Sequence, residues 1–356
     1  MRRLIPWRRR RALAAIFLVA VGLFAVVFTF NRDRPKSGIV VRERTLEDWI
    51  EAMLHSDYRA EDAIKEAGTN ATPLLLEPLA RRTTMANTLW VKTWPKLPGF
   101  LQSRSEKPVL ARDARMNTVA LLRDLPEQSK TILPELLRRL EDEDAQVRLH
   151  AAITMGNIGA DARAAMPTLL EFTRSTAHVM RVYSARALWK VSGEVDPALT
   201  VLEAGLQEKS AKFRWAAPVF LGEMGAEAAR AIPLLQEAAK DSDKEVASLC
   251  LQALAKISAE SIPILVEHLK SEDPGMRISA AFALGELGPK AVEAVPALRL
   301  LLDDKASGSP AIMGRAVGGE KVSDAALAAL EKIEGVRRSK IPTMPLRIDG
   351  PMRFLR

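Results

Sequence analysis

The sequence has few residues of the kinds that form disulfides, aromatic cores or catalytic sets. Its 356 residues include one cysteine, four histidines and only 5% aromatic residues. A single cysteine excludes an intramolecular disulfide and a cluster of cysteine metal ligands. Because Cys250 lies in the Ala- and Leu-rich stretch ASLCLQAL, we interpret it as a small buried apolar residue rather than a reactive thiol.

Motifs that carry chemistry are also missing from the sequence. The histidines form no pair four residues apart and no HExxH motif, and they lie in different parts of the chain: His55, His150, His178 and His268. Neither a Gly-rich phosphate loop nor a GxSxG motif occurs. We therefore predict no catalytic residues, no metal site and no cofactor. Acidic clusters such as Glu141 to Asp144 are interpreted as residues that stabilise helix starts.

The positive charge of the chain is confined to its two ends. The net charge is +8, but residues 1–36 contain nine basic residues and one acidic residue, and residues 337–356 contain six basic residues and one acidic residue. Residues 37–336 therefore carry about five more negative than positive charges. A surface that follows nucleic-acid phosphates would need an excess of cations. We expect no nucleic-acid partner.

One long hydrophobic run is present, at residues 12–30, with 19 uncharged residues. As a helix it would span roughly 28 Å, close to the hydrocarbon thickness of a bilayer. A cleaved signal peptide is the alternative, although the run ends in VVFTF, without small residues for cleavage. Because six arginines precede the run, residues 1–11 are predicted to be cytoplasmic. The rest of this single-pass protein would then lie on the periplasmic or extracellular side, after a polar linker at residues 31–44.

A repeat of about 33 residues dominates the remainder of the chain. Arginines recur at steps of 33 at Arg115, Arg148, Arg181 and Arg214. A proline marks the start of the second helix in most repeats, at Pro134, Pro167, Pro233, Pro263 and Pro296. Apolar residues at offsets −1, +2 and +6 from this position fall on one face of a helix, which predicts a buried stripe. Such helix pairs become stable by stacking on their neighbours.

The first helix of each repeat is rich in small residues and ends at a glycine. Small residues allow close helix contacts and are expected to do so at Gly156, Gly222 and Gly285. The helix end is predicted three residues later, at Gly159, Gly225 and Gly288. Two departures stand out: Trp189 occupies the slot of Gly156, and Pro218 should kink its helix.

Two stretches interrupt the period and are predicted to be irregular insertions, residues 83–107 and 305–321. The first contains an aromatic group that could contact a partner or cover the end of the repeats: Trp90, Trp94 and Phe100. After the second, residues 322–335 are expected to form a capping helix. The basic tail, residues 336–356, is predicted to be flexible.

These features resemble the HEAT repeat family, and most closely its short subclass known from phycobilin lyases. The resemblance rests on the acid-rich turn before Val-Arg, the helix-ending glycine and the apolar-Pro-x-Leu opening of the second helix. It implies an all-α, right-handed α-solenoid of about seven helix pairs over residues 45–335, preceded by one transmembrane helix.

The resemblance also implies that the second helices line a partner-binding side. Their exposed positions would then include an apolar strip and charged residues, at Arg138, Glu171, Val201, Leu234, Glu237, Ile264 and Glu267. Acidic residues at offset +8, such as Asp142, Asp241 and Asp304, are expected to face the partner as well. This predicts a groove for a protein segment with basic and apolar side chains, although a merely solvated face is the alternative.

The predicted function is therefore a membrane-anchored protein-binding scaffold rather than an enzyme. A bilin-lyase-like or other HEAT-fold enzyme is the first alternative, because the repeat subclass suggests it. A DNA-binding HEAT-like protein is a weaker one, because the repeats lack excess positive charge.

Overall fold

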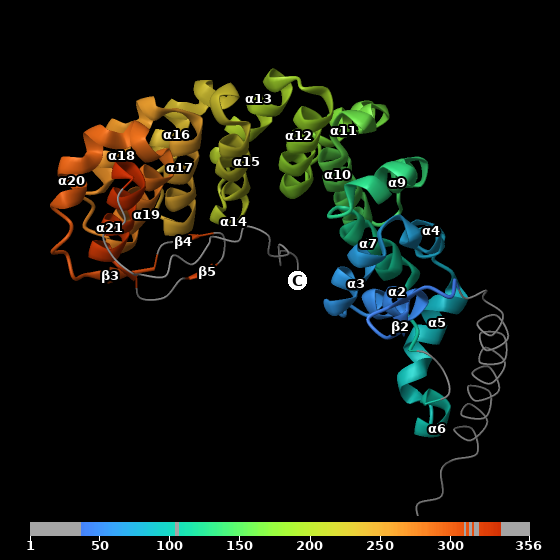
Figure 1. Cartoon of the computed structure of the whole chain (residues 1–356). Helices are drawn as coiled ribbons and strands as arrows, with labels where there is room; N and C mark the ends of the chain where they lie inside the picture. Colours follow the sequence, from blue (N-terminus) through green and yellow to red (C-terminus); the bar gives the residue numbers. More distant parts are fainter. Residues whose placement is uncertain (1–36, 104–106, 310, 313–314, 317–319, 336–356) are drawn as a thin grey trace, which may run out of the picture. The chain divides into compact units, whose positions relative to one another are not determined.

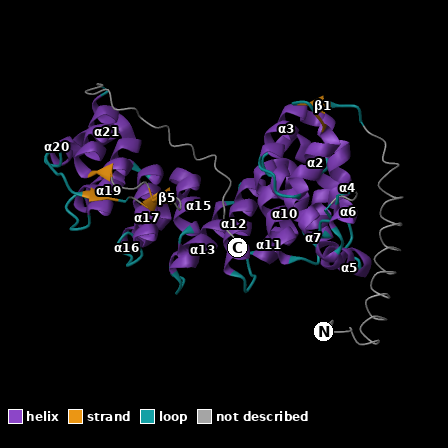
Figure 2. Cartoon of the chain, turned by 90° about the horizontal axis from the view of Figure 1, so that it is seen from below, coloured by secondary structure: helices purple, strands orange, loops and turns teal. Residues whose placement is uncertain are grey.

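The computed structural model describes residues 37–103, 107–309, 311–312, 315–316 and 320–335 (Figure 1). The chain forms two compact units, residues 1–198 and 199–356, and the division falls within α13 (Val195–Leu206). Helices make up most of both units (Figure 2). This confirms the prediction of a helical repeat protein.

The first unit begins with a two-stranded hairpin and continues with helices. Its elements are β1 (Val40–Val41), β2 (Arg44–Thr45), α2 (Leu46–Leu54), α3 (Arg59–Ala67), α4 (Thr72–Ala80), α5 (Met85–Thr93), α6 (Gly99–Gln102), α7 (Ala111–Leu122), α8 (Pro126–Thr131), α9 (Leu133–Arg139), α10 (Ala145–Ile158), α11 (Met166–Phe172) and α12 (His178–Ser192).

The second unit contains the more regular repeats and two short strand pairs. Its elements are α14 (Ala211–Arg214), α15 (Ala216–Met224), α16 (Ile232–Ala238), α17 (Lys244–Ile257), α18 (Ile262–His268), α19 (Pro274–Leu287), α20 (Val295–Arg299), β3 (Ser307–Gly308), β4 (Ala311–Ile312), β5 (Arg315–Ala316), β6 (Glu320–Lys321) and α21 (Val322–Glu334).

The most regular repeats share the same local signals. Aspartates cap the first helices α10, α17 and α19, because the carboxylates of Asp144, Asp243 and Asp273 accept backbone N–H groups of the first turn. The predicted helix-ending glycines have positive φ angles of 75° at Gly159, 60° at Gly225 and 57° at Gly288. A short 3₁₀ turn follows each glycine, and the second helix then begins with proline in its first turn.

One repeat is three residues shorter, and its turn differs accordingly. After α17 the chain has Ser258 with φ −159° instead of a glycine, and the 3₁₀ turn spans only Ala259–Ser261. Because the shorter connection does not need a positive φ, the glycine is not required there. This accounts for the step of 30 between Pro233 and Pro263.

First helices stack on first helices through small residues. In the first unit α7 packs on α10 and α10 on α12; in the second, α15 packs on α17, α17 on α19 and α19 on α21. A Cβ placed on Gly156 would lie 2.8 Å from the Cα of Ala187. The equivalent distances are 3.1 Å from Gly222 to Ala253 and 3.2 Å from Gly285 to Ala329. The prediction of close approach at these glycines is confirmed.

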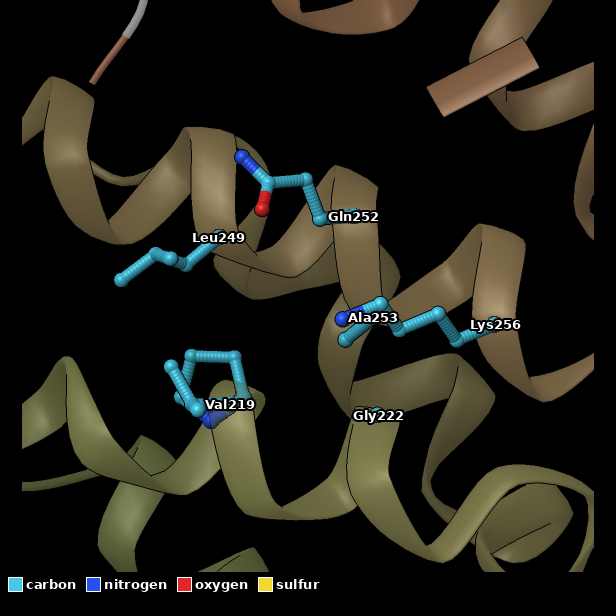
Figure 3. A pocket seen from close by; sticks show the side chains of 7 residues that line it. Val219, Gly222, Leu249, Gln252, Ala253 and Lys256 are labelled. Atoms are coloured by element: carbon cyan, nitrogen blue, oxygen red, sulfur yellow. The ribbon is translucent and has the colours of Figure 1, made fainter. Parts of the chain in front are cut away.

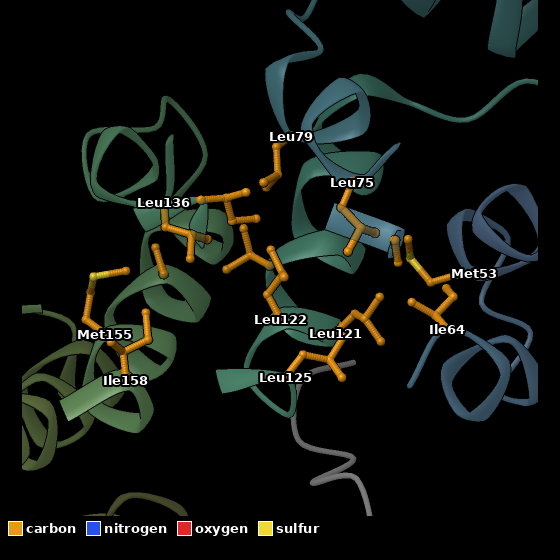
Figure 4. Packing of buried hydrophobic residues seen from close by; sticks show 14 of the residues in the cluster. Met53, Ile64, Leu75, Leu79, Leu121, Leu122, Leu125, Leu136, Met155 and Ile158 are labelled. Carbon is orange, nitrogen blue, oxygen red and sulfur yellow. The ribbon is translucent and has the colours of Figure 1, made fainter. Parts of the chain in front are cut away.

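The core of the first unit runs through successive repeats. Leucines from the second helices and the first helices meet between the layers, including Leu75, Leu79, Leu122 and Leu136 (Figure 4). In the second unit Cys250 is fully buried in α17, and burial raises the pKa of its thiol. The interpretation of Cys250 as a small apolar core residue is confirmed.

Pro218 divides its helix as predicted. The first helix of that repeat consists of α14 and α15, which are separated at Trp215. Proline cannot donate to the carbonyl four residues earlier, that of Arg214, so the helix breaks at this point.

The linker prediction for residues 31–44 is wrong where the structure describes it. Residues 40–45 form the β1–β2 hairpin, in which Val40 pairs with Thr45. The hairpin is fixed to α2 because the indole N–H of Trp49 donates to the carbonyl of Val41 at 2.7 Å. Val41 itself is buried. The hairpin is therefore part of the folded unit.

The two predicted insertions contain more regular secondary structure than expected. Residues 83–107 contain α5 and α6, joined by a 3₁₀ turn at Trp94–Lys96. Residues 305–321 contain two antiparallel strand pairs, β3 with β6 and β4 with β5. The second insertion packs tightly on the start of α19, since a Cβ on Gly308 would lie 2.8 Å from the Cα of Gly275.

Residues 1–36 and 336–356 lie outside the described part of the chain. The predictions of a cytoplasmic segment at 1–11, a transmembrane helix at 12–30 and a flexible tail at 336–356 concern these residues. Among the residues that are described, no helix is both long enough and apolar enough to cross a membrane.

Candidate partner-binding surface

The second helices of the second unit display the predicted strip of mixed character. Leu234 on α16 and Ile264 on α18 occupy equivalent places and are half-buried. Each is followed three residues later by an exposed glutamate, Glu237 and Glu267. Leu300, at the end of α20, is 83% exposed. We call Leu234, Glu237, Ile264, Glu267 and Leu300 the second-helix strip.

Beside this strip, α18 and the end of α16 line an open groove. Its walls are formed by Lys240, Pro263, Val266, Glu267, His268, Lys270 and Ser271. The ammonium group of Lys240 lies 3.6 Å from the carboxylate of Glu237. Half-burial lowers the pKa of His268, with a further lowering by Lys240 that Glu267 opposes. The groove therefore carries both signs of charge beside two apolar residues, Pro263 and Val266.

The first unit places Arg138 and Glu171 at equivalent positions of α9 and α11. Arg138 is exposed, and its guanidinium donates to Glu135 at 2.7 Å. Glu171 is exposed beside Leu170, which is 40% exposed. Val201, the remaining predicted strip residue, is half-buried in α13.

The repeated arginines form a ladder that the sequence did not explain. In four repeats the guanidinium donates to two carbonyl oxygens of the turn before its own helix; Arg148, for example, donates to the carbonyls of Asp142 at 2.6 Å and Glu143 at 3.2 Å. The other three are Arg181, Arg214 and Arg277. Each of these arginines therefore satisfies carbonyl groups that have no partner in the helix.

Three of the repeated arginines, Arg115, Arg214 and Arg277, join neighbouring repeats through an aspartate 27 residues later. The Nε atom of the arginine lies 2.8 Å from Asp142 in the Arg115 pair, 2.6 Å from Asp241 in the Arg214 pair and 2.9 Å from Asp304 in the Arg277 pair. Although burial alone would raise it, the hydrogen bonds from Arg214 hold the pKa of Asp241 below its usual value.

The expectation that the acidic residues at offset +8 face a partner is therefore wrong. The side chains of Asp142 and Asp241 are only 2% and 10% exposed, and they are paired with arginines. Offset +8 lies beyond the end of the short second helix, in the turn, so the helical face does not extend to it. The strip is consequently less acidic than the sequence suggested.

The three aromatic residues of the first insertion do not form one surface. Trp90 is 3% exposed, Trp94 is half-buried and Phe100 is 62% exposed. Trp90 belongs to the inner face of α5, so only Phe100 is fully available for contact.

A small cavity lies between α15 and α17 in the second unit (Figure 3). It is lined by Pro218, Val219, Gly222, Leu249, Gln252, Ala253 and Lys256, and its volume is about 30 Å³. This cavity can hold about one water molecule and is too small for a tetrapyrrole. Within the described ranges, no group of three or more His, Cys, Asp or Glu side chains is arranged to hold a metal ion.

His150, on α10, makes folding dependent on pH. Its Nδ1 atom is buried without a hydrogen-bond partner, and burial, assisted by Arg123, lowers its pKa to about 4. The unfolded chain, with a histidine pKa of about 6.5, therefore binds more protons between pH 6.5 and 4, and stability is lost as the pH falls through this window. We expect the first unit to lose about 2 kcal/mol between pH 7.5 and 5 from this group.

Urea unfolding of the full chain at several pH values checks this expectation. The H150Q variant should have a shallower slope over this range, because glutamine does not titrate. Equal slopes for the wild type and H150Q would contradict the assignment.

Two family models match segments of the repeat region. A model described as HEAT repeat matches residues 132–162, and one described as HEAT repeats matches residues 231–309. The search of curated proteins gives no match. Among solved structures, the chain is similar to the X-ray structure of YibA from Escherichia coli, with a TM-score of 0.39 and 16% identity, covering 71% of this chain and 99% of that one. Residues 132–162 and 231–309 are thus similar to HEAT repeats, which commonly mediate interactions between proteins.

Proposed function

We propose that the protein is a membrane-anchored scaffold that binds another protein through the second-helix strip, on the periplasmic or extracellular side. The repeats supply a rigid row of equivalent positions rather than a catalytic centre. The hydrophobic run at residues 12–30, with six arginines before it, supports both the anchor and its orientation.

The observation that carries the binding site is a repeated pair on consecutive second helices, an aliphatic residue and a glutamate three positions later. Leu234 and Ile264 offer partly exposed aliphatic surface, and Leu300, at the α20 position equivalent to the glutamates, adds a largely exposed apolar side chain. Apolar positions of this kind can anchor a partner, while Glu237 and Glu267 at the border favour a basic one. The ligand that fits is a protein segment with apolar and basic side chains.

One experiment on the full chain tests both location and binding. Since Cys250 is buried, an L300C variant offers a single exposed thiol in the folded second unit. In cells whose outer layer is permeabilised while the cytoplasm stays closed, a membrane-impermeant, thiol-reactive photo-crosslinker should label this variant. Illumination should then link the labelled chain covalently to one partner. Labelling only after the cytoplasm is opened would contradict the proposed orientation.

A charge variant of the strip tests whether the captured protein binds there. In the L300C background, E237K together with E267K should reduce crosslinking about tenfold, because two favourable border charges become repulsive. The matched control is E272K together with E293K, which changes the same charge at two exposed glutamates outside the strip. Equal crosslinking in both pairs would refute the binding site.

A further inference from the structure

Helix α5 presents apolar side chains to solvent, contrary to the usual pattern. Met85, Leu89 and Lys92 are spaced i, i+4 and i+7 and so lie along one stripe of the helix. Met85 is 89% exposed and Leu89 is 42% exposed. The opposite face contains Trp90, which is 3% exposed. The helix therefore uses one apolar face for the fold and leaves a second one uncovered.

The orientation of α5 is fixed by polar contacts on its inner side. The amide of Asn87 donates to the carbonyl of Val109 at 3.1 Å and accepts from the N–H of Ala111 at 3.0 Å. These bonds tie α5 to the start of α7. The exposure of Met85 and Leu89 is thus a property of the folded unit rather than of a loose segment.

The next helix adds an exposed aromatic residue. Phe100, on α6, is 62% exposed. The turn before it is braced because the amide of Gln102 donates to the carbonyl of Leu97 at 2.8 Å. An ordered, exposed phenylalanine close in sequence to the α5 stripe increases the apolar surface that this insertion offers.

All charged residues between positions 82 and 103 are basic. Arg82, Lys92 and Lys96 are exposed, and none of them has an ion-pair partner within the described ranges. The preceding stretch is the reverse, since residues 37–80 contain four basic and nine acidic residues. Positive charge in this part of the fold is therefore concentrated beside the exposed apolar side chains.

We propose that these residues form a docking surface for an anionic lipid bilayer. We call Arg82, Met85, Leu89, Lys92, Lys96 and Phe100 the α5–α6 patch. Apolar side chains flanked by exposed basic residues, with no acidic residue between positions 82 and 103, match the boundary between acyl chains and anionic headgroups. An acidic protein surface would match the same charge, and the proposed anchor at residues 12–30 favours the bilayer because it holds the unit next to lipid.

The length of the tether makes this contact favourable. Residue 37, the first described residue, is seven residues after the end of the hydrophobic run, and seven residues span at most about 25 Å. A unit held this close to a bilayer meets lipid at a high effective concentration, so even a weak patch becomes occupied. The tether rests on the proposed membrane anchor, whereas the affinity of the patch for lipid does not.

The test uses the full chain in lipid nanodiscs with an environment-sensitive fluorophore at one thiol. In the F100C variant, spin-labelled lipids should quench the fluorophore in discs that contain phosphatidylglycerol, and less in discs of phosphatidylcholine alone. The matched control is Y58C, which offers an exposed thiol in the acidic part of the same unit and should not be quenched. Each of the neutralising substitutions R82Q, K92Q and K96Q should lower the partitioning of the patch into the bilayer about fivefold, and the quenching should weaken accordingly.

Two outcomes would overturn the lipid proposal. Both can be distinguished from a failure of the proposed membrane anchor. Equal quenching at positions 100 and 58, or quenching that is insensitive to lipid charge, would refute the patch even if the chain enters the discs. A chain that does not enter the discs would count against the anchor. The same labelled chain added to phosphatidylglycerol vesicles would then report on the patch alone, and an unchanged emission spectrum would refute it.

Discussion

Replacing Arg115 by alanine is expected to lower the free energy of unfolding of the first unit by about 3–5 kcal/mol. The guanidinium of Arg115 is 2% exposed and lies against the carboxylate of Asp142, which is also 2% exposed. It additionally donates to the carbonyl of Arg81 at 2.7 Å and to Glu143 at 3.0 Å. Removal of the guanidinium would leave the buried carboxylate of Asp142 without its main ion-pair partner.

Replacing Arg115 is expected to cost more unfolding free energy than replacing the other repeated arginines, because Arg115 joins three segments. It connects α7 to the turn before α10 and to the chain between α4 and α5. We expect the loss to appear in urea unfolding of the full chain, and amide hydrogen exchange should locate it in α4, α7 and α9. The effect should be far smaller in the second unit.

A surface arginine and a double variant provide the controls for this prediction. R138A removes a guanidinium that is 72% exposed and paired with Glu135, so it should cost no more than about 1 kcal/mol. The double variant R115A with D142A should be less destabilised than the sum of the single variants, because no buried charge is left alone. A loss in R115A no larger than in R138A would show that the ladder is not a source of stability.

The G156A variant is expected to destabilise the first unit by about 1–3 kcal/mol, although alanine is the better helix former. The new methyl group would lie 2.8 Å from the Cα and 3.1 Å from the Cβ of Ala187 on the neighbouring helix. Both atoms belong to a packed helix and cannot rotate away. The two first helices, α10 and α12, must therefore separate.

Two other glycines calibrate this cost. The methyl group of G222A would meet Ala253 at 3.1 Å, so that variant should lose less. Gly99, at the start of α6, has no atom within 4 Å of an added Cβ, so G99A should be neutral or slightly stabilising. Thermal unfolding of the three variants in the full chain checks the order, and an unchanged G156A would contradict the packing argument.

The sequence predicted the repeats well because their signals are local. The proline at the start of each second helix, the glycine at the end of each first helix and the kink at Pro218 depend on backbone geometry within a few residues. The buried leucine stripe follows from helical periodicity. The same reasoning identified Gly156, Gly222 and Gly285 as contact positions, although the neighbouring residue in each contact came only from the structure.

The regular structure of the insertions was not predicted, because it depends on contacts distant in sequence. In the first insertion, α5 is held by Asn87 through the backbone of residues 109 and 111. In the second insertion, Gly308 meets Gly275 more than thirty positions earlier. Periodicity contains no information about such pairs.

The same distinction between local signals and contacts of distant residues holds for the candidate site. The sequence by itself determined that the chain is a row of stacked helix pairs and which second-helix positions, such as Leu234 and Ile264, lie next to the buried stripe, because helical periodicity and caps act within one repeat. Only the tertiary structure decided that Asp142, Asp241 and Asp304 pair with arginines of the preceding repeat and that α5 exposes Met85 and Leu89. Pairing between repeats and exposure of a helix face depend on which surfaces the stacked helices bring together.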